Sequence, residues 1–209
     1  LPVTRVMSCP KSGCGNAPTE LARVGLIASN IVSDGAEIFW TEADVHPTGY
    51  VVACAAAGCG GVPRILAQPW APRGIALANG LLYWSTEGRA GPARIQRCPK
   101  DCVSPETVVE EGDGAVPGQL LAPQVVGNDL YWILQDFDAN RELRGRLRTC
   151  SLLGPCVPRT VIELRDRLNG LAVGNDTLAW FADKTSGRCT LPACSDAMPV
   201  ANEIGGVGI

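Results

Sequence analysis

The hydrophobic and polar positions of the chain form a short pattern that occurs four times. A small apolar run such as Ile75-Ala76-Leu77 meets an Asp-Gly, Asn-Gly or Asn-Asp turn, and an apolar-aromatic segment ending in tryptophan follows. Turn residues of this kind tolerate the positive φ angles of a two-residue hairpin. Each copy therefore predicts two antiparallel strands joined by a tight turn.

The tryptophans define the length of the repeat. Trp40, Trp84, Trp132 and Trp180 recur every 44 to 48 residues. After each of them come a polar loop of variable length, a strand running into a cysteine, a second cysteine and a last strand, which is led by proline at Pro158. Four antiparallel strands in about 45 residues are typical of a β-propeller blade.

We name the four strands of a repeat A to D in chain order. Strand A, before the turn, consists of small residues, as expected at the crowded centre of a propeller. Strand D begins at proline, which cannot donate to a strand ladder and so favours an outer edge. The pattern predicts an all-β, disulfide-stapled propeller of four-stranded antiparallel blades, with five or six blades in the intact ring and four complete in this chain. The four repeated tryptophans are expected to pack between neighbouring blades.

The ends of the chain do not contain complete repeats. We expect one propeller domain over residues 1–209, with a partial blade at 1–22, complete blades at 23–67, 68–110, 111–163 and 164–203, and the start of a further blade at 204–209. The closing blade would lack the strand that carries the aromatic-Trp pair. Since that gap would expose unpaired backbone, we expect the chain to be a fragment of a longer polypeptide or to assemble with a missing piece.

Three of the repeats resemble a known class of propeller. The segments Trp40-Thr41-Glu42, Tyr83-Trp84-Ser85-Thr86 and Tyr131-Trp132 are similar to YWTD-type repeats of low-density-lipoprotein-receptor ectodomains and, more loosely, to NHL-type repeats. No copy reads Tyr-Trp-Thr-Asp in full, and one cysteine pair per blade departs from the receptor pattern. The Cys-x-x-x-Gly-Cys hairpins resemble those of exported propeller proteins of soil bacteria such as myxobacteria. The resemblance implies an architecture without an activity.

The ten cysteines form one close pair per repeat, between strands C and D. Facing ends of antiparallel strands lie about 4.5 to 5.5 Å apart at Cα, which suits a disulfide. Zinc would need two pairs to converge, and haem attachment would need a histidine after the second cysteine, yet the single histidine is His46. The predicted bridges, which imply an oxidising compartment, are Cys9–Cys14, Cys54–Cys59, Cys98–Cys102, Cys150–Cys156 and Cys189–Cys194.

Composition excludes several classes of protein. With 46% hydrophobic and 19% charged residues the chain can bury a core. A net charge of −3 provides no basic footprint for nucleic acid, and no apolar run approaches the roughly 18 residues that insert into a bilayer. With one histidine, there is little scope for a Ser-His-Asp site or a His-ligated metal, and no phosphate-binding glycine motif is present.

Candidate binding residues lie on the loops between strands B and C and between D and A, which emerge on one face of a propeller. These loops vary in length, as functional loops usually do. Trp70 is the aromatic residue without a counterpart in other repeats, and either anchors a ligand or caps the core. The predicted binding set is Trp70, Arg73, Glu87, Asp136, Arg141 and Asp183. Other polar residues at this face are Glu42, Asp44, His46, Arg89, Asp138, Arg144, Asn169 and Lys184.

These features predict a binding or scaffold propeller that is secreted, periplasmic or on a cell surface and that recognises a protein or a glycan. We expect no enzymatic activity, cofactor, nucleic acid or membrane insertion. The alternative is a metal-dependent hydrolase or lyase similar to gluconolactonase, with calcium in the axial channel. Asn30, Arg73, Gln124 and Asn169 would lie near that axis, but they are not a carboxylate set.

Overall fold

The computed structural model describes residues 4–43, 48–88, 91–112, 118–138, 140–174, 176–191 and 194–201 of the 209-residue chain. These residues form strands and no helix, so none of them belongs to a helix that could span a membrane. The chain divides into two compact units. Unit 1 comprises Leu1–Glu87 and Arg94–Glu110, and unit 2 comprises Gly88–Ala93 and Glu111–Ile209.

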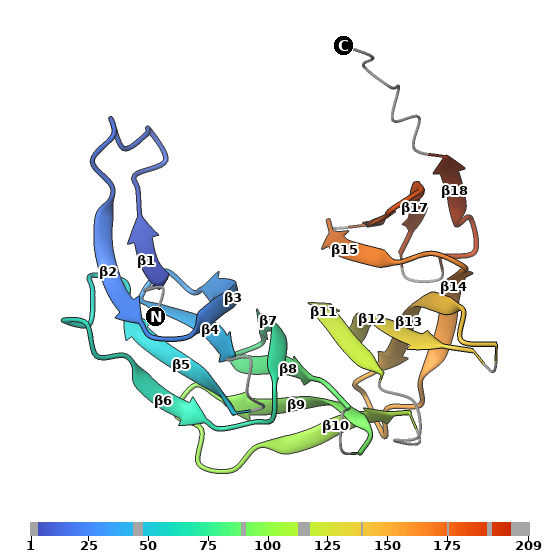
Figure 1. The fold of residues 1–209 in the computed structure, drawn as a ribbon, viewed down its shortest axis with the longest axis horizontal. Helices are drawn as coiled ribbons and strands as arrows, with labels where there is room; N and C mark the ends of the chain where they lie inside the picture. The colour runs from blue at the N-terminus through green and yellow to red at the C-terminus, as the bar shows by residue number, and fades with distance from the viewer. Residues whose placement is uncertain are drawn as a thin grey trace. The chain divides into compact units, whose positions relative to one another are not determined.

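The strands form one two-stranded sheet and four four-stranded antiparallel sheets, which are the blades of a β-propeller (Figure 1). The two-stranded sheet pairs β1 (Thr4–Ser8) with β2 (Thr19–Val24). Blade 1 contains β3 (Ile27–Ser33), β4 (Glu37–Ala43), β5 (Gly49–Ala55) and β6 (Arg64–Ala67). Blade 2 contains β7 (Pro72–Ala78), β8 (Leu81–Thr86), β9 (Ala93–Pro99) and β10 (Glu106–Glu111). The predicted fold class is confirmed.

The other two blades belong to unit 2. Blade 3 contains β11 (Gln119–Val126), β12 (Asp129–Phe137), β13 (Leu143–Ser151) and β14 (Arg159–Leu164). Blade 4 contains β15 (Leu168–Val173), β16 (Thr177–Ala182), β17 (Thr185–Thr190) and β18 (Met198–Ala201). In every blade the strands pair in chain order, so that strand A and strand D form opposite edges. Strand β3 contacts β7 in unit 1, and β11 contacts β15 in unit 2, as expected for innermost A strands.

Three of the repeated tryptophans fill the space between a blade and the sheet before it. Trp40 packs with Val6 and Leu21 of the two-stranded sheet, and Trp84 packs with Phe39 of blade 1. Trp180 packs with residues of blade 3. All four indoles are at most 2% exposed. Burial and contacts together confirm the predicted packing role for Trp40, Trp84 and Trp180. A flat indole suits this place because large aromatic side chains bury the most apolar surface per residue.

Every A strand contains a bulge near the residue that faces the tryptophan. The pairing shifts between Ala28 and Ile31, between Pro72 and Ile75, between Leu121 and Gln124, and between Leu168 and Gly170. Bulges redirect side chains and increase local twist. Beside two of them, a strand B side chain bonds to the A strand of the next blade: Thr41 Oγ1 donates to Arg73 O at 2.7 Å, and Gln135 Nε2 donates to Leu168 O.

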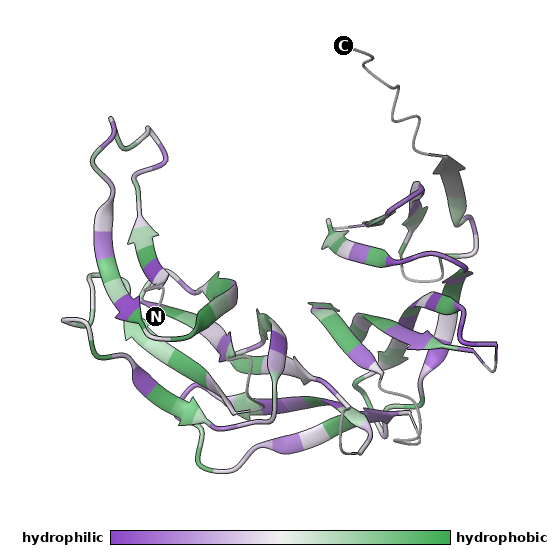
Figure 2. Cartoon of the chain, viewed as in Figure 1, coloured by the Kyte–Doolittle hydropathy of each residue, from purple (hydrophilic) through white to green (hydrophobic). Residues whose placement is uncertain are grey.

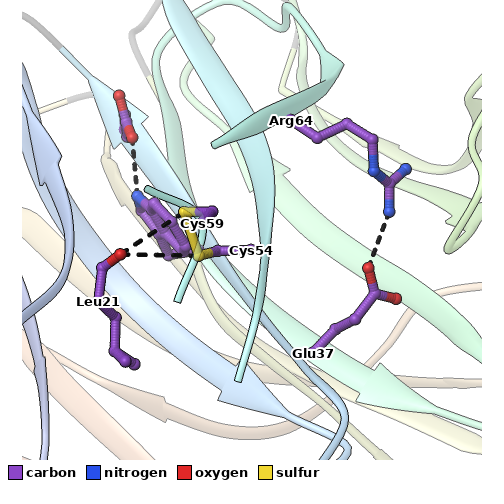
Figure 3. The surroundings of a disulfide bond; sticks show 7 residues. Leu21, Glu37, Cys54, Cys59 and Arg64 are labelled. Carbon is purple, nitrogen blue, oxygen red and sulfur yellow. Dashed lines mark hydrogen bonds and ion pairs between the residues drawn. A yellow bond between two sulfur atoms is a disulfide. The ribbon is translucent and has the colours of Figure 1, made fainter. Parts of the chain in front are cut away.

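All ten cysteines form the five predicted disulfides, with Cα–Cα distances of 4.8 to 5.3 Å. The bridges do more than close hairpins, since Cys54, Cys98, Cys150 and Cys189 are at most 3% exposed. Figure 3 shows the Cys54–Cys59 bridge lying against the carbonyl of Leu21, which also accepts a hydrogen bond from Cys59 N at 3.4 Å. This bridge therefore fastens blade 1 to β2.

We expect the Cys98→Ala/Cys102→Ala variant to lose about 2 kcal/mol of unfolding free energy through loop-closure entropy, plus a packing loss because Cys98 is buried in the core. The Cys9→Ala/Cys14→Ala variant is the matched control, since Cys9 is exposed and its loop is of similar length. Urea denaturation measures both losses. Equal losses would contradict a packing role for Cys98.

Candidate functional site

A pocket of about 480 Å³ lies on one face of blade 3, within unit 2. The residues that line it are Glu111, Gly112, Gly118, Leu134, Asp136, Phe137, Arg146 and Arg148. Ligand pockets in proteins typically enclose roughly 300–1,000 Å³. The pocket is therefore large enough for a small ligand or for one part of a larger one.

The alternation of side chains along two paired strands builds this pocket. Arg144, Arg146 and Arg148 lie on one face of β13, because successive residues of a strand point to opposite faces. The other face carries Gly145, Leu147 and Thr149, all of which are buried. Figure 2 shows hydrophilic residues on β13 and mainly hydrophobic residues on β11. The sequence Arg-x-Arg-x-Arg thus places a row of guanidinium groups on a single face.

Cross-strand pairing adds apolar and acidic groups to that row. Trp132 of β12 faces Arg148, and Leu134 faces Arg146. Asp136 lies on the same face as Leu134, two residues further along β12. Cross-strand and diagonal neighbours on one face of a sheet are close enough to interact. The pocket thus combines charged groups of both signs with the aliphatic side chain of Leu134.

The deepest polar group is Glu111, the last residue of β10. Arg148 donates to its Oε1 through Nε at 2.9 Å and Nη2 at 2.6 Å, while Trp132 Nε1 donates to its Oε2 at 3.0 Å. The Glu111 side chain is 7% exposed and that of Arg148 is 16% exposed. A buried carboxylate is tolerated when it is paired and hydrogen-bonded in this way. This triad forms a rigid, charge-balanced wall of the pocket.

The second ion pair is less completely bonded. Arg146 Nη2 donates to Asp136 Oδ2. The other carboxylate oxygen, Asp136 Oδ1, and Arg146 Nε are buried without a hydrogen-bond partner. Buried polar atoms of this kind are uncommon, because each costs about 1–3 kcal/mol. Phe137, the neighbour of Asp136 at the pocket, is 46% exposed.

Of the six predicted binding residues, Asp136 lines this pocket. Arg141 is exposed in the β12–β13 hairpin, with a positive φ of 61°. The hairpin is organised by Asp138, whose Oδ1 accepts the N–H groups of Asn140 and Glu142 at 2.8 and 3.0 Å. The backbone bond from Glu142, together with Arg144, holds the pKa of Asp138 below its usual value. The role of Arg141 in ligand binding stays a prediction.

Two other predicted residues, Arg73 and Glu87, form an ion pair in blade 2. The Glu87 side chain is 2% exposed, and Arg73 Nε donates to its Oε1 at 2.6 Å. Arg73 stands in the strand A bulge, and Glu87 is three residues after the repeated tryptophan. The pair links the start of strand A to the end of strand B.

The same positions of blade 4 hold Asn169 and Asp183. Asn169 stands in the strand A bulge, Asp183 is three residues after Trp180, and Asn169 Nδ2 donates to Asp183 Oδ1 at 2.6 Å. Polar pairing at this position is therefore a repeated feature of the fold. A repeated contact of this kind accounts for Arg73, Glu87 and Asp183 as parts of the scaffold, and their role in binding stays a prediction.

Trp70 lies in the connection between β6 and β7. Its backbone forms a bridge with Thr48, and the next residue, Ala71, accepts a hydrogen bond from Glu87 N at 3.2 Å. The indole is 45% exposed. Nearly half of its surface is therefore available to a ligand, while the other half covers the protein. Asp44, His46 and Arg89, which the loops also carry, lie outside the described residues.

Sequence reasoning did not single out Glu111, Phe137, Arg146 or Arg148. One signal for the site was the strand C residue that faces each repeated tryptophan. In the four blades this residue is Val52, Gln96, Arg148 and Gly187. A charged residue occupies that place in blade 3 alone. Among the described residues, no group of three or more His, Cys, Asp or Glu is arranged to hold a metal ion. The calcium-dependent alternative stays a prediction.

Neither a protein-family model nor a curated protein sequence matches the chain. Solved structures with similar folds include a prolyl endopeptidase (TM-score 0.61, 14% identity, 95% of this chain and 32% of that one). Others are a puromycin hydrolase (TM-score 0.58, 12% identity, 87% and 33%) and prolyl oligopeptidase B from Galerina marginata (0.57, 12%, 95% and 33%). The chain spans about a third of the length of these proteins. At such low identity the similarity shows the fold alone: this chain is a β-propeller.

Proposed function

We propose that the chain is the binding propeller of a protein that acts outside the cytoplasm, and that its ligand is a glycan bound in the blade 3 pocket. The five disulfides support the location, because local bridges of this kind form and persist in oxidising compartments. The resemblance of the Tyr-Trp repeats to those of receptor ectodomains supports the same location. The loops and pocket of a rigid scaffold support a binding role.

The observation that carries the glycan proposal is the two arginine–carboxylate pairs beside Leu134 in one pocket, where Asp136 Oδ1 and Arg146 Nε have no hydrogen-bond partner among the described residues. A pyranose ring has an apolar C–H face, which packs on apolar side chains such as that of Leu134. Its hydroxyl groups both donate and accept hydrogen bonds. Carboxylates accept and guanidinium groups donate, so adjacent pairs such as Asp136–Arg146 match both needs of one hydroxyl-rich ligand.

A protein ligand would be expected to use a different kind of surface. The centre of a protein interface is depleted in charged residues and enriched in aromatic ones. The walls of this pocket instead contain two carboxylates and two guanidinium groups in a confined space. We therefore take a glycan as the ligand, and recognition of a protein as the outcome that would replace it.

Binding to an array of neutral and uronic-acid-containing oligosaccharides tests this proposal. Calorimetry with the best array ligand should show that Asp136→Ala weakens binding at least tenfold, which corresponds to about 1.4 kcal/mol. Glu142→Ala is the matched control, because Glu142 is an exposed carboxylate of the same blade that does not line the pocket. Unchanged affinity in Asp136→Ala, or binding to proteins but to no oligosaccharide, would contradict the proposal.

A further inference from the structure

A second, smaller pocket lies in unit 1, between β2 and the face of blade 1 that packs against it. Its volume is about 250 Å³. The walls are mainly aliphatic, from Val24, Val52 and Ile65, with the ring of Tyr50 beside them. The polar residues that line it are Glu42 of β4 and Arg23 of β2.

Among the described residues, the carboxylate of Glu42 is buried in this pocket without a counter-charge. The residue is 6% exposed, and Trp40 Nε1 donates to its Oε1 at 2.8 Å. In the part of the chain that the structure describes, no basic side chain forms an ion pair with Glu42, and the guanidinium of Arg23 pairs with Glu20 instead. Burial raises the pKa of Glu42, and the Trp40 bond offsets this only in part.

The other buried glutamates of the described chain have ion-pair partners. Glu87 is paired with Arg73, and Glu111 is paired with Arg148. The residue that faces the tryptophan in blade 1 is Val52, at the place where blade 3 has Arg148. In blade 2, the neutral Gln96 accepts the bond from Trp84 Nε1 at 3.2 Å. Among the buried glutamates of the described chain, Glu42 is thus the one without an arginine partner, because Val52 stands where blade 3 has Arg148.

We propose that this pocket binds a primary ammonium group carried on an alkyl stem, with Glu42 as its counter-ion. Oε1 is occupied by Trp40, which leaves Oε2 to accept one further strong bond. An ammonium group needs a single acceptor, whereas a guanidinium fork prefers both oxygens of a carboxylate. The aliphatic walls and Tyr50 surround the methylene stem and the cation. Pairing would offset the cost of a lone buried charge.

The ammonium group could belong to a free amine or to the lysine side chain of another polypeptide. The chemistry at Glu42 is the same in both cases. Binding should weaken as the pH falls through the pKa of Glu42, because the protonated carboxyl loses its charge. The other charged or titratable residues at the pocket are Arg23 on β2 and Tyr50 on β5. The site lies in unit 1, so its test is independent of the test of the glycan pocket in unit 2.

Titration of the ¹⁵N-labelled chain with n-butylammonium tests this proposal, and the indole N–H resonance of Trp40 is the reporter because it is bonded to Glu42. Butanol is the neutral control probe, and Nα-acetyl-lysine methylamide distinguishes a lysine side chain from a free amine. We expect saturable shifts with butylammonium at pH 7.5, no shift with butanol, and at least tenfold weaker binding to Glu42→Gln. Asp101→Asn, an exposed carboxylate of the same unit, should bind as the unmodified chain does.

The pH dependence of the unfolding free energy tests, without any ligand, whether Glu42 is a buried and unpaired carboxylate. A folded-state pKa above the ordinary value means that ionisation of Glu42 destabilises the fold as the pH rises above about 4.5. The Glu42→Gln variant should therefore gain stability relative to the unmodified chain between pH 4.5 and pH 7.5. The proposal is overturned if that gain is absent, or if butylammonium leaves Trp40 unshifted or binds Glu42→Gln equally well.

Discussion

Replacement of Arg148 by methionine is expected to lower the unfolding free energy of unit 2 by about 3–5 kcal/mol. The substitution leaves the Glu111 carboxylate, 7% exposed, with the Trp132 indole as its remaining bonded partner. Removing one member of a buried ion pair is costly because the other charge stays in a medium that solvates it poorly. Methionine has a similar length and fills the space of the arginine stem, so lost packing contributes little. Urea denaturation of the two proteins measures the difference.

The Glu111→Gln/Arg148→Met double variant is the control for this prediction. It removes both charges, while the amide oxygen of glutamine can still accept the bond from Trp132. Most of the lost stability should therefore return, since the penalty arises from the unpaired charge and not from the absence of the pair. A loss below about 1 kcal/mol in Arg148→Met would show that Glu111 is solvated well enough to need no partner.

Replacement of Trp84 by alanine should be the other severe change, with an expected loss of about 3–5 kcal/mol. The indole is completely buried in the cluster that joins blade 2 to Phe39, Val51 and Ala53 of blade 1. Truncation removes that apolar contact and leaves a cavity that a close-packed sheet fills poorly. Thermal and urea denaturation of the folded chain measure the loss.

Trp70→Ala is the matched control, because it removes the same side chain from a position that is 45% exposed. Its expected effect is much smaller than that of Trp84→Ala, since substitutions at exposed positions are usually within about 0.5 kcal/mol. A loss near that of Trp84→Ala would show that Trp70 caps the core and is not held ready for a ligand. A near-neutral effect leaves its exposed half available for binding.

The blades were predictable because their determinants are local. The turn before each tryptophan, such as Ala78-Asn79-Gly80, is determined by a few neighbouring residues. The same holds for the alternation of hydrophobic and polar residues around the tryptophan. The disulfides were predictable for the same reason, with sequence separations of four to six residues. Features that depend on nearby residues alone need no knowledge of how distant strands meet.

The candidate site was harder to predict because its parts come from distant positions. Arg148 and Glu111 are 37 residues apart, and the arginines of β13 have the alternation of a strand with one solvated face. Their partial burial goes with the ion pairs that Arg148 forms with Glu111 and Arg146 forms with Asp136, which the repeat does not specify. The prediction instead concentrated on variable loops, where Asp136 stands at the edge of the pocket while Arg141 remains in solvent.

The repeated tryptophans show how one position acquires different chemistry. Trp40 is bonded to Glu42, Trp84 to Gln96 and Trp132 to Glu111. Trp180 Nε1 is buried without a partner, and Gly187 faces it at a place where a Cβ atom would collide with the indole. The fold requires the indole ring, and the polar partner is free to vary between blades. The polar partner of the tryptophan therefore varies within a geometry that all four blades repeat, and in blade 3 this partner, Glu111, lines the pocket.

The most direct test of the account is an NMR titration of the labelled chain with the oligosaccharide that binds best on the array. If the oligosaccharide binds in the blade 3 pocket, the Nε–H resonances of Arg146 and Arg148 should shift together and saturate at one ligand per chain. Resonances of Trp70 and of the Asn169–Asp183 pair should stay in place. Shifts confined to Trp70, Arg73 or Asp183, with the blade 3 arginines unmoved, would contradict binding in this pocket.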